Sequence, residues 1–397
     1  MNTLPIKIFQ NSVTQNQPSM NHKRTIVFNR FYTLIFILIF SGLLSSCRLY
    51  RYVVYNFADI KDYKIFPSRA LHNDSAKFQF STTTNGIVPK TIKDYKKNNK
   101  EIKFEEYLES NNTVAFLIIK NDTIQYEHYF KRYYQQSIVP SFSMAKSITS
   151  FLIGCAIDDG LIKSVDDPIT NYLPELKKNG LEKVTIKHLL QMTSGIKFNE
   201  SYINPFGEVA SFYYGRNLRK NVYKMKLKTE PGKEFKYISG NPQVLGLILE
   251  RVLKPKTLTE YLQEKLWQPL GMEYDATWSI DKKKNGIEKT FCCINARARD
   301  FAKIGRLYLN KGNWNGKQIV SEKWVIESTK IDSTGGGVGF YHYQWWFPTK
   351  NGDYMAVGLL GQYIYINPSK NLIIVRLGKK EGKIDWWNFL PYLATYY

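Results

Sequence analysis

The apolar residues near the two ends of this chain form two pairs of short runs. In the first pair, residues 113–119 read TVAFLII, Asn121-Asp122 offers a turn, and a second run follows at 124–129. In the other pair, runs at 362–366 and 372–375 flank the segment NPSKN. Apolar runs of this length around turn residues are typical of β-hairpins. Because the hairpins lie far apart in sequence, they predict one antiparallel sheet built from both ends of the chain.

The middle of the chain has helical spacing of its apolar residues. The spacing is clearest in residues 186–192, 244–253, 258–266 and 300–309, where apolar positions recur every three or four residues. Together the two patterns predict an α/β (α+β) fold, in which an antiparallel sheet is flanked by helices and carries a mainly helical insertion at about 165–300.

Residues 1–46 have the character of an export signal. The run at 31–44 is too short to span a bilayer, follows the basic residues Lys23, Arg24 and Arg30, and precedes Ser45-Ser46-Cys47. The string LSSC at 44–47 resembles a bacterial lipobox, in which the cysteine becomes the acylated first residue. We therefore expect export and a lipid anchor at Cys47 on a bacterial membrane, facing the periplasm or the surface, with Met20 as the expected true start. A plain signal peptide with an incidental cysteine is the alternative.

Residues 47–105 are polar and basic, with a few aromatic residues such as Tyr50 and Phe57. They predict an N-terminal tether that leads into a folded domain at 106–397. With 43% hydrophobic and 15% aromatic residues among 397, the chain has enough apolar side chains for a sizeable core, which excludes disordered and fibrous classes.

The formal net charge is +22, from 56 basic and 34 acidic residues. Such a charge is compatible with an anionic partner such as nucleic acid, a cell-wall polymer or anionic lipid. The lysines are spread along the chain, however, and no nucleic-acid-binding motif accompanies them. We therefore interpret the charge as a compositional bias and expect no nucleic-acid partner.

Neither the cysteines nor any cofactor-binding motif predicts a reactive site in this sequence. Four cysteines are too few for a disulfide framework in a chain of this length. The adjacent Cys292 and Cys293 could bridge only with strain, so these two and Cys155 are interpreted as packing residues. The sequence has no H-E-x-x-H pair, P-loop, Rossmann glycine fingerprint or G-x-S-x-G elbow. We expect no metal and no cofactor.

A candidate nucleophile, Ser143, opens a predicted helix in the string SMAK, and the helix ends at Asp158-Asp159-Gly160. Residues three apart share a helix face, so Lys146 lies one turn beyond the serine hydroxyl. A lysine kept neutral by burial can accept the serine proton, and the N–H at the helix start can face an oxyanion. On this motif alone, Ser143 as a helix cap beside a surface Lys146 is equally compatible.

Several further motifs resemble the serine β-lactamase and penicillin-recognising superfamily, in particular its class C-like branch of DD-peptidases, family VIII esterases and 6-aminohexanoate-dimer hydrolases. They are SMAKS at 143–147, TIKHLLQMTSG at 185–195, PG at 231–232 followed by YISGN at 237–241, LGM at 270–272, ARDFAKIG at 298–305 and GLLGQ at 358–362. These motifs occur in the family's order between about residues 110 and 380.

The resemblance implies a serine hydrolase of β-lactamase-like fold that cleaves an ester or amide through an acyl-enzyme on Ser143. It implies Lys146 as the base, Tyr237 as the proton relay, and the N–H groups of Ser143 and Leu359 as the oxyanion hole. By the same resemblance Ser239 and Gly358 border the substrate.

An aromatic cluster follows the helical region, with Trp345 and Trp346 among its members. These rings could wall an apolar acyl pocket, and a role in the core is equally compatible. His342, which lies in the cluster, is interpreted as a structural histidine.

Two departures from the family pattern distinguish between its branches. Ala356 stands where enzymes acting on β-lactams or D-Ala-D-Ala keep a cation or a histidine, and Ser239 stands where class C β-lactamases keep an asparagine. Both favour a small-molecule ester or amide substrate. A DD-peptidase or β-lactamase acting on cell-wall peptide, and a non-catalytic surface-binding lipoprotein on the same scaffold, are the alternatives.

Overall fold

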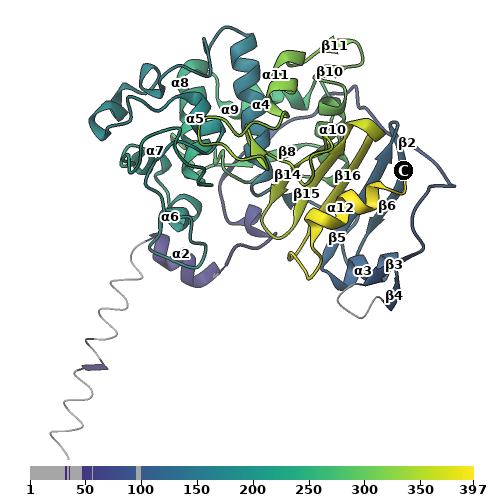
Figure 1. The fold of residues 1–397 in the computed structure, drawn as a ribbon. Coiled ribbons are helices and arrows are strands. Elements are labelled where there is room, and N and C mark those ends of the chain that lie inside the picture. Colours follow the sequence, from purple (N-terminus) through teal and green to yellow (C-terminus); the bar gives the residue numbers. More distant parts are fainter. Residues whose placement is uncertain (1–31, 34, 36–46, 56, 95–99) are drawn as a thin grey trace, which may run out of the picture.

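A computed structural model describes residues 32, 33, 35, 47–55, 57–94 and 100–397 of this chain (Figure 1). The predicted signal segment, residues 1–46, lies almost wholly outside the described residues. Among those described, no helix combines the length and apolar character needed to cross a membrane. Cys47 is the first residue of helix α2 (Cys47–Tyr55).

The central feature is an eight-stranded sheet in the order β12-β13-β14-β15-β16-β5-β6-β2. Its strands are β12 (Tyr341–His342), β13 (Trp345–Trp346), β14 (Tyr354–Gly358), β15 (Gln362–Asn367), β16 (Leu372–Gly378), β5 (Thr113–Lys120), β6 (Thr123–Tyr129) and β2 (Ser81–Thr82). All neighbouring strands are antiparallel except β2 and β6. Strand β16 pairs with β5, with Val375 opposite Leu117, so the two predicted hairpins join into one sheet as expected.

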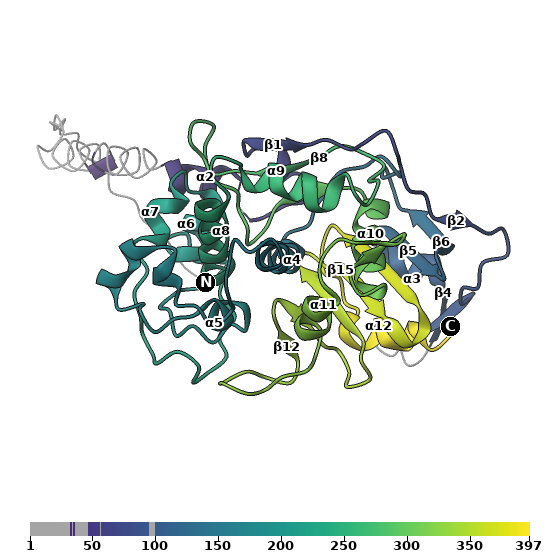
Figure 2. The same cartoon turned by 90° about the horizontal axis from the view of Figure 1, so that it is seen from above.

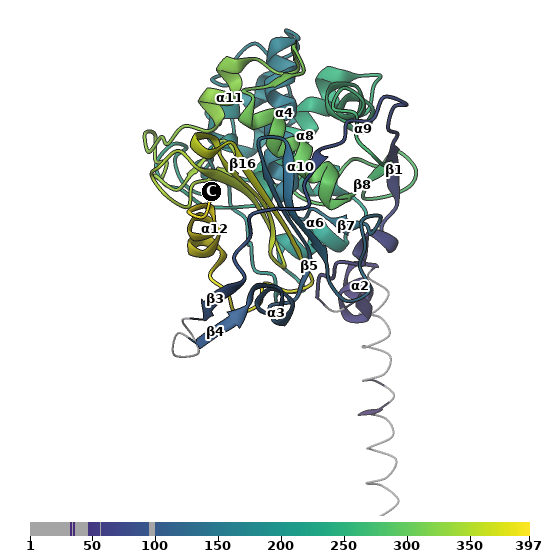
Figure 3. The same ribbon diagram turned by 90° about the vertical axis from the view of Figure 1, so that its right-hand side faces the viewer.

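Helices cover both faces of this sheet, which explains the unbroken apolar runs at 114–119 of β5 and 372–375 of β16. Leu117 and Ile119 of β5 belong to the core that also holds α4 (Met144–Asp158) and α10 (Ala298–Leu309). Phe116 and Ile118 face a second core beneath α3 (Phe104–Ser110) and α12 (Trp386–Ala394). Figure 3 shows α12 on one side of the sheet and α4 and α10 on the other.

The predicted helical insertion follows α4. Its elements are η3 (Ile169–Asn171), η4 (Pro174–Asn179), α5 (Ile186–Leu190), α6 (Glu208–Tyr214), α7 (Leu218–Val222), α8 (Gly240–Leu253), α9 (Leu258–Leu262) and η5 (Gln263–Trp267). Helix α5 begins with a capping box between Thr185 and His188, which gives His188 a structural role. Figure 2 shows α4 between these helices and the sheet, so residues at its N-terminus lie where the two parts meet.

The segment predicted as a tether is folded onto the body. Strand β1 (Ser68–Leu71) pairs with β8 (Ala276–Ser279) in a second sheet of order β1-β8-β9-β7, where β9 is Ile294–Ala296 and β7 is Val139–Pro140. Strands β3 (Thr91–Asp94) and β4 (Lys100–Lys103) form a hairpin. Ile60, Leu71 and Phe80 are at most 4% exposed. The prediction of a tether at 47–105 is therefore corrected over residues 57–94, because a few widely spaced apolar side chains are enough to dock a polar segment.

The remaining short elements complete the outline. They are η1 (Asp62–Lys64), the pair β10 (Asn313–Trp314) and β11 (Lys317–Gln318), α11 (Glu322–Ser328) and η6 (Pro368–Lys370).

Candidate active site

Ser143 and Lys146 meet at the start of α4. Ser143 occupies the N-cap position, but its side chain makes no capping hydrogen bond. The preceding Phe142 has a φ of +43°, a left-handed conformation that turns the chain sharply into the helix. The Nζ of Lys146 donates to the Oγ of Ser143 at 2.8 Å. The hydroxyl is therefore paired with the lysine as the sequence predicted, and the alternative of a capping serine beside a surface lysine does not hold.

Lys146 is buried, with 2% of its surface exposed. Besides Ser143, its ammonium group donates to the carbonyl oxygen of Phe291 at 3.0 Å. Burial lowers the pKa of Lys146 to about 8, and the charge of Glu200 opposes this shift. A substantial fraction of this lysine is neutral near pH 8, the form that can accept a proton.

Tyr237 lies just before α8 and faces the same pair. The Nζ of Lys146 is 5.0 Å from the centroid of its ring. Burial raises the pKa of Tyr237, with a smaller contribution from Glu200, while a hydrogen bond with Ser143 acts in the opposite direction. The ring packs against Tyr341 at 5.9 Å and Trp346 at 5.3 Å between centroids. The structure thus brings together the three residues that the motifs predicted.

Glu200 is a component of the site that the sequence analysis missed. One of its carboxylate oxygens accepts from the Ser239 hydroxyl at 2.6 Å, and the other accepts from the Ser239 backbone N–H at 2.7 Å. The Tyr202 hydroxyl also donates to Glu200, at 2.9 Å. No local pattern around residues 196–203 marked this carboxylate, because its partner Ser239 belongs to a different segment.

An apolar cavity of about 210 Å³ opens beside the serine. Its lining includes Ser143 and Leu359, whose backbone N–H groups are the predicted oxyanion donors, together with Ser239. The apolar walls are Tyr52, Phe57, Ala58, Phe142, Tyr202, Val209, Ala210, Tyr213, Tyr214, Phe291, Cys292 and Leu360. Three of these residues come from the N-terminal segment, which the sequence assigned to the tether.

Gly358 ends β14 directly against the chain that leads to Ser143. A Cβ atom at this position would lie 2.3 Å from the carbonyl oxygen of Ser141. That carbonyl is held in place, because Ser141 exchanges hydrogen bonds with Ile294 through its N–H and its hydroxyl. Gly358 is not among the residues that line the cavity, which corrects its predicted place beside the substrate. Its absent side chain allows the strand to approach the chain before Ser143.

The two tryptophans lie outside the cavity lining. Trp345 is 0% exposed and packs on Tyr308 and Tyr354, with ring centroids 4.5 and 5.4 Å away. It belongs to the core, which corrects its predicted contact with substrate. Trp346 packs on both Tyr237 and Tyr341, so it supports the ring of Tyr237. Ala356 is also buried, with 1% of its surface exposed.

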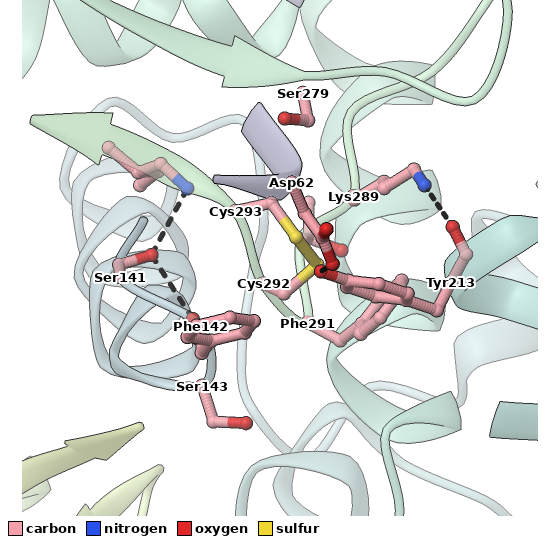
Figure 4. The surroundings of a disulfide bond; sticks show 12 residues. Asp62, Ser141, Phe142, Ser143, Tyr213, Ser279, Lys289, Phe291, Cys292 and Cys293 are labelled. Atoms are coloured by element: carbon pink, nitrogen blue, oxygen red, sulfur yellow. Dashed lines mark hydrogen bonds between the residues drawn. A yellow bond between two sulfur atoms is a disulfide. The ribbon is translucent and has the colours of Figure 1, made fainter. Parts of the chain in front are cut away.

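Cys292 and Cys293 form a disulfide, which corrects their interpretation as separate packing residues. Cys293 has a φ of +76°, and a turn in which the Cys292 N–H donates to the Lys289 carbonyl precedes the pair. Local sequence spacing did not reveal this backbone conformation. Figure 4 shows the bridge beside Phe142 and Phe291, close to Ser143. Cys155 is buried and free, as expected for a packing residue.

Comparison with known proteins assigns the family. The model of the Beta-lactamase family matches residues 103–386. The chain belongs to the Beta-lactamase family.

Individual members of the family resemble the chain over most of its length. The 6-aminohexanoate-dimer hydrolase of Paenarthrobacter ureafaciens is 29% identical over 294 residues, which cover 69% of this chain and 74% of that protein. The structure of a proposed 6-aminohexanoate-dimer hydrolase from Bacillus anthracis aligns with a TM-score of 0.73 at 22% identity, covering 87% of this chain and 92% of the other. A family VIII carboxylesterase aligns with a TM-score of 0.55 at 16% identity, covering 71% and 91%. The chain is thus a β-lactamase-like serine hydrolase, as its motifs predicted.

Proposed function

We propose that this hydrolase cleaves an ester or amide whose acyl group is apolar, through an acyl-enzyme on Ser143. The hydrogen bond between Lys146 and Ser143, at the mouth of an apolar cavity, is the observation that carries the proposal. The resemblance to a 6-aminohexanoate-dimer hydrolase supports a small ester or amide as substrate.

The geometry supports a division of roles among three side chains. Neutral Lys146 accepts the proton of Ser143 as its oxygen attacks the carbonyl carbon. The resulting oxyanion lies toward the N–H groups of Ser143 and Leu359, each such donor contributing about 10²- to 10³-fold to the rate. Tyr237 is protonated at neutral pH because its pKa is raised, so it can pass a proton to the leaving group. Water then hydrolyses the ester on Ser143.

Two features favour this substrate class over β-lactams and D-Ala-D-Ala peptides. Ala356 offers no charge to a substrate carboxylate. The Ser239 hydroxyl donates its only proton to Glu200, so the group at the asparagine position of class C β-lactamases has no donor left for the carbonyl of a substrate amide. A β-lactam that forms a lasting adduct on Ser143 would favour the DD-peptidase alternative.

A larger side chain in the cavity wall tests the proposed acyl pocket. Ala210 of α6 is 4% exposed and lines the cavity. We expect Ala210→Phe to lower kcat/KM for p-nitrophenyl octanoate by about tenfold or more, because the ring occupies the space of the acyl chain, and to leave p-nitrophenyl acetate within about threefold. The exposed Ala76 lies outside the lining, so Ala76→Phe is the matched control. Equal losses on both esters with Ala210→Phe would contradict the acyl pocket.

The pH dependence follows from Lys146. Its pKa is lowered to about 8, and the neutral form is the base, so its population increases as the pH passes through 8. We expect kcat/KM to rise with pH to half its maximum near pH 8. The measurement is a pH profile of ester hydrolysis at constant ionic strength. A profile whose acid limb lies at about pH 4, where carboxyl groups titrate, would assign the base to another group.

The proposal includes export and a lipid anchor at Cys47. The basic and apolar signal before Cys47 supports export, as does the Cys292–Cys293 bridge, since disulfides persist mainly in oxidising compartments. Helix α2 begins at Cys47 and its Tyr52 lines the cavity, so an anchored enzyme would hold its acyl pocket near the membrane surface.

The anchor is tested by fractionation. We expect Cys47→Ala to move the protein from the membrane fraction to the soluble one, because the residue that carries the lipid is lost. Cys155→Ala, at a buried and free cysteine, is the control. Unchanged fractionation of Cys47→Ala would exclude this anchor.

A further inference from the structure

A cluster of potential metal ligands lies outside the active site, at the end of α11. Glu327 of α11, Asp332 of the following loop and His342 of β12 place their ligand atoms within 4.8 Å of one another. His342 is 0% exposed, whereas the two acids are partly exposed. The sequence predicted no metal site, and these three residues form no recognised motif.

The buried imidazole has one nitrogen without a hydrogen-bond partner. The Nε2 of His342 makes none among the described residues, and its nearest carboxylate oxygen, Oε1 of Glu327, is 3.9 Å away. That distance is too long for a hydrogen bond. Buried polar groups normally have a partner, so we expect a bound molecule or ion between this nitrogen and the two carboxylates that contacts all three groups. Water could serve, and so could a cation.

The surroundings hold each ligand in place. Glu327 pairs with Lys330 through Oε2 at 2.8 Å, which leaves Oε1 toward the histidine. Asp332 accepts two hydrogen bonds from Thr334 on Oδ1, at 2.7 and 2.8 Å. One oxygen of each carboxylate is thus fixed by a neighbour and the other is available, which is how outer contacts orient the ligands of a metal.

The other ring nitrogen of His342 lies 3.2 Å from the side-chain amide of Gln191. The atom of Gln191 at this position is the amide nitrogen Nε2. Turning the amide by 180° exchanges its nitrogen and oxygen, so that the Nδ1–H of His342 donates to the amide oxygen and the lone pair of the histidine Nε2 is directed at the carboxylates. Neutral imidazole is the form that binds a metal.

We propose that Glu327, Asp332 and His342 bind a first-row divalent cation, with Zn²⁺ as the best match. One imidazole nitrogen and two carboxylate oxygens suit Zn²⁺ better than Mg²⁺ or Ca²⁺, which prefer all-oxygen shells. Ligand atoms around tetrahedral Zn²⁺ are about 3.4 Å apart, so the acids close in by roughly 1 Å on binding. Water completes the shell.

The bound cation is structural, because none of its three ligands lines the cavity beside Ser143. It joins α11, the loop after it and β12. Gly336 of that loop packs so closely on residues 232–234 that an added Cβ would lie 2.6 Å from the carbonyl carbon of Lys233. Tyr341, which precedes His342, packs on Tyr237. The cation therefore stabilises the layer that supports the catalytic tyrosine, and the inference does not depend on the proposed substrate.

The test is calorimetric titration of the metal-free full chain with ZnCl2, followed by Co²⁺ as a spectroscopic probe. We expect one tight Zn²⁺ equivalent, a rise in Tm on binding, and visible absorption of the Co²⁺ form. Glu327→Gln and Asp332→Asn keep the shape of each side chain, and we expect each to weaken Zn²⁺ binding by at least about tenfold.

Two control variants separate this site from adventitious binding. Glu322→Gln lies on the same helix and also loses one lysine partner, Lys311. His72→Gln removes an exposed histidine beside Asp275. Both should bind Zn²⁺ as the unmodified chain does. The proposal would be overturned, in favour of water at Nε2, if the unmodified chain bound no Zn²⁺ tightly. It would also be overturned if Glu327→Gln and Asp332→Asn bound Zn²⁺ with the affinity of the unmodified chain.

Discussion

Replacing Ser143 by Ala is expected to reduce kcat by about 10⁴- to 10⁶-fold, because the acyl-enzyme can no longer form. Lys146→Ala and Tyr237→Phe should each cost orders of magnitude as well. If the three side chains act as one unit, as proposed from their contacts, the double variants should lose little more than the worst single one. Steady-state hydrolysis of an activated ester measures all of these variants.

Covalent labelling tests whether Ser143, rather than Lys146 or Tyr237, is the nucleophile. A fluorophosphonate should add one adduct to the unmodified chain, seen by intact mass, and none to Ser143→Ala. Ser194 begins another S-x-x-K string, SGIK at 194–197, and provides a matched control, since it is buried and donates to Asn241 at 2.7 Å. Ser194→Ala should retain the adduct. An adduct that persists in Ser143→Ala would place the nucleophile elsewhere, and no adduct on folded protein would favour a non-catalytic binding role.

Adding one methyl group at Gly358 is expected to lower kcat by about 10²-fold or more. The new Cβ would lie 2.3 Å from the Ser141 carbonyl oxygen. Ser141 itself is held by the hydrogen bonds that its N–H and its hydroxyl exchange with the backbone of Ile294. Strand β14 or the chain before Ser143 must therefore move, and a displacement of about 1 Å at a catalytic group is sufficient for such a loss. The same crowding should lower Tm.

Gly339→Ala is the control for this effect. Gly339 is exposed, and its nearest neighbour to an added Cβ is the side chain of Ile331 at 3.8 Å, an ordinary contact. We expect it to retain activity and Tm. If Gly358→Ala were as active as Gly339→Ala, the close approach of β14 would not position the nucleophile. We expect a fluorophosphonate to label Gly358→Ala at a reduced rate. Such labelling would show that the variant is folded and that its active site is displaced.

The sequence by itself determined the sheet and the identity of the three candidate catalytic residues, because both depend on local patterns. Residues 114–119 of β5 and 372–375 of β16 are buried on both faces of the sheet, and unbroken apolar runs satisfy that requirement. The spacing of Ser143 and Lys146 within one helical turn fixes their contact once α4 forms. Tyr237 was found from its motif, and its place beside Lys146 agrees with that prediction.

The tertiary structure alone decided what surrounds these residues. Glu200 bonds to Ser239, the docked N-terminal segment supplies Tyr52 to the cavity, and Trp345 belongs to the core. The unpartnered nitrogen of His342 likewise became visible only when α11 and β12 were brought together. Each of these features joins segments distant in sequence. Hydrophobic periodicity specifies which face of an element is buried but not which distant side chain meets it there, and that choice is made by packing and hydrogen bonding in the folded chain.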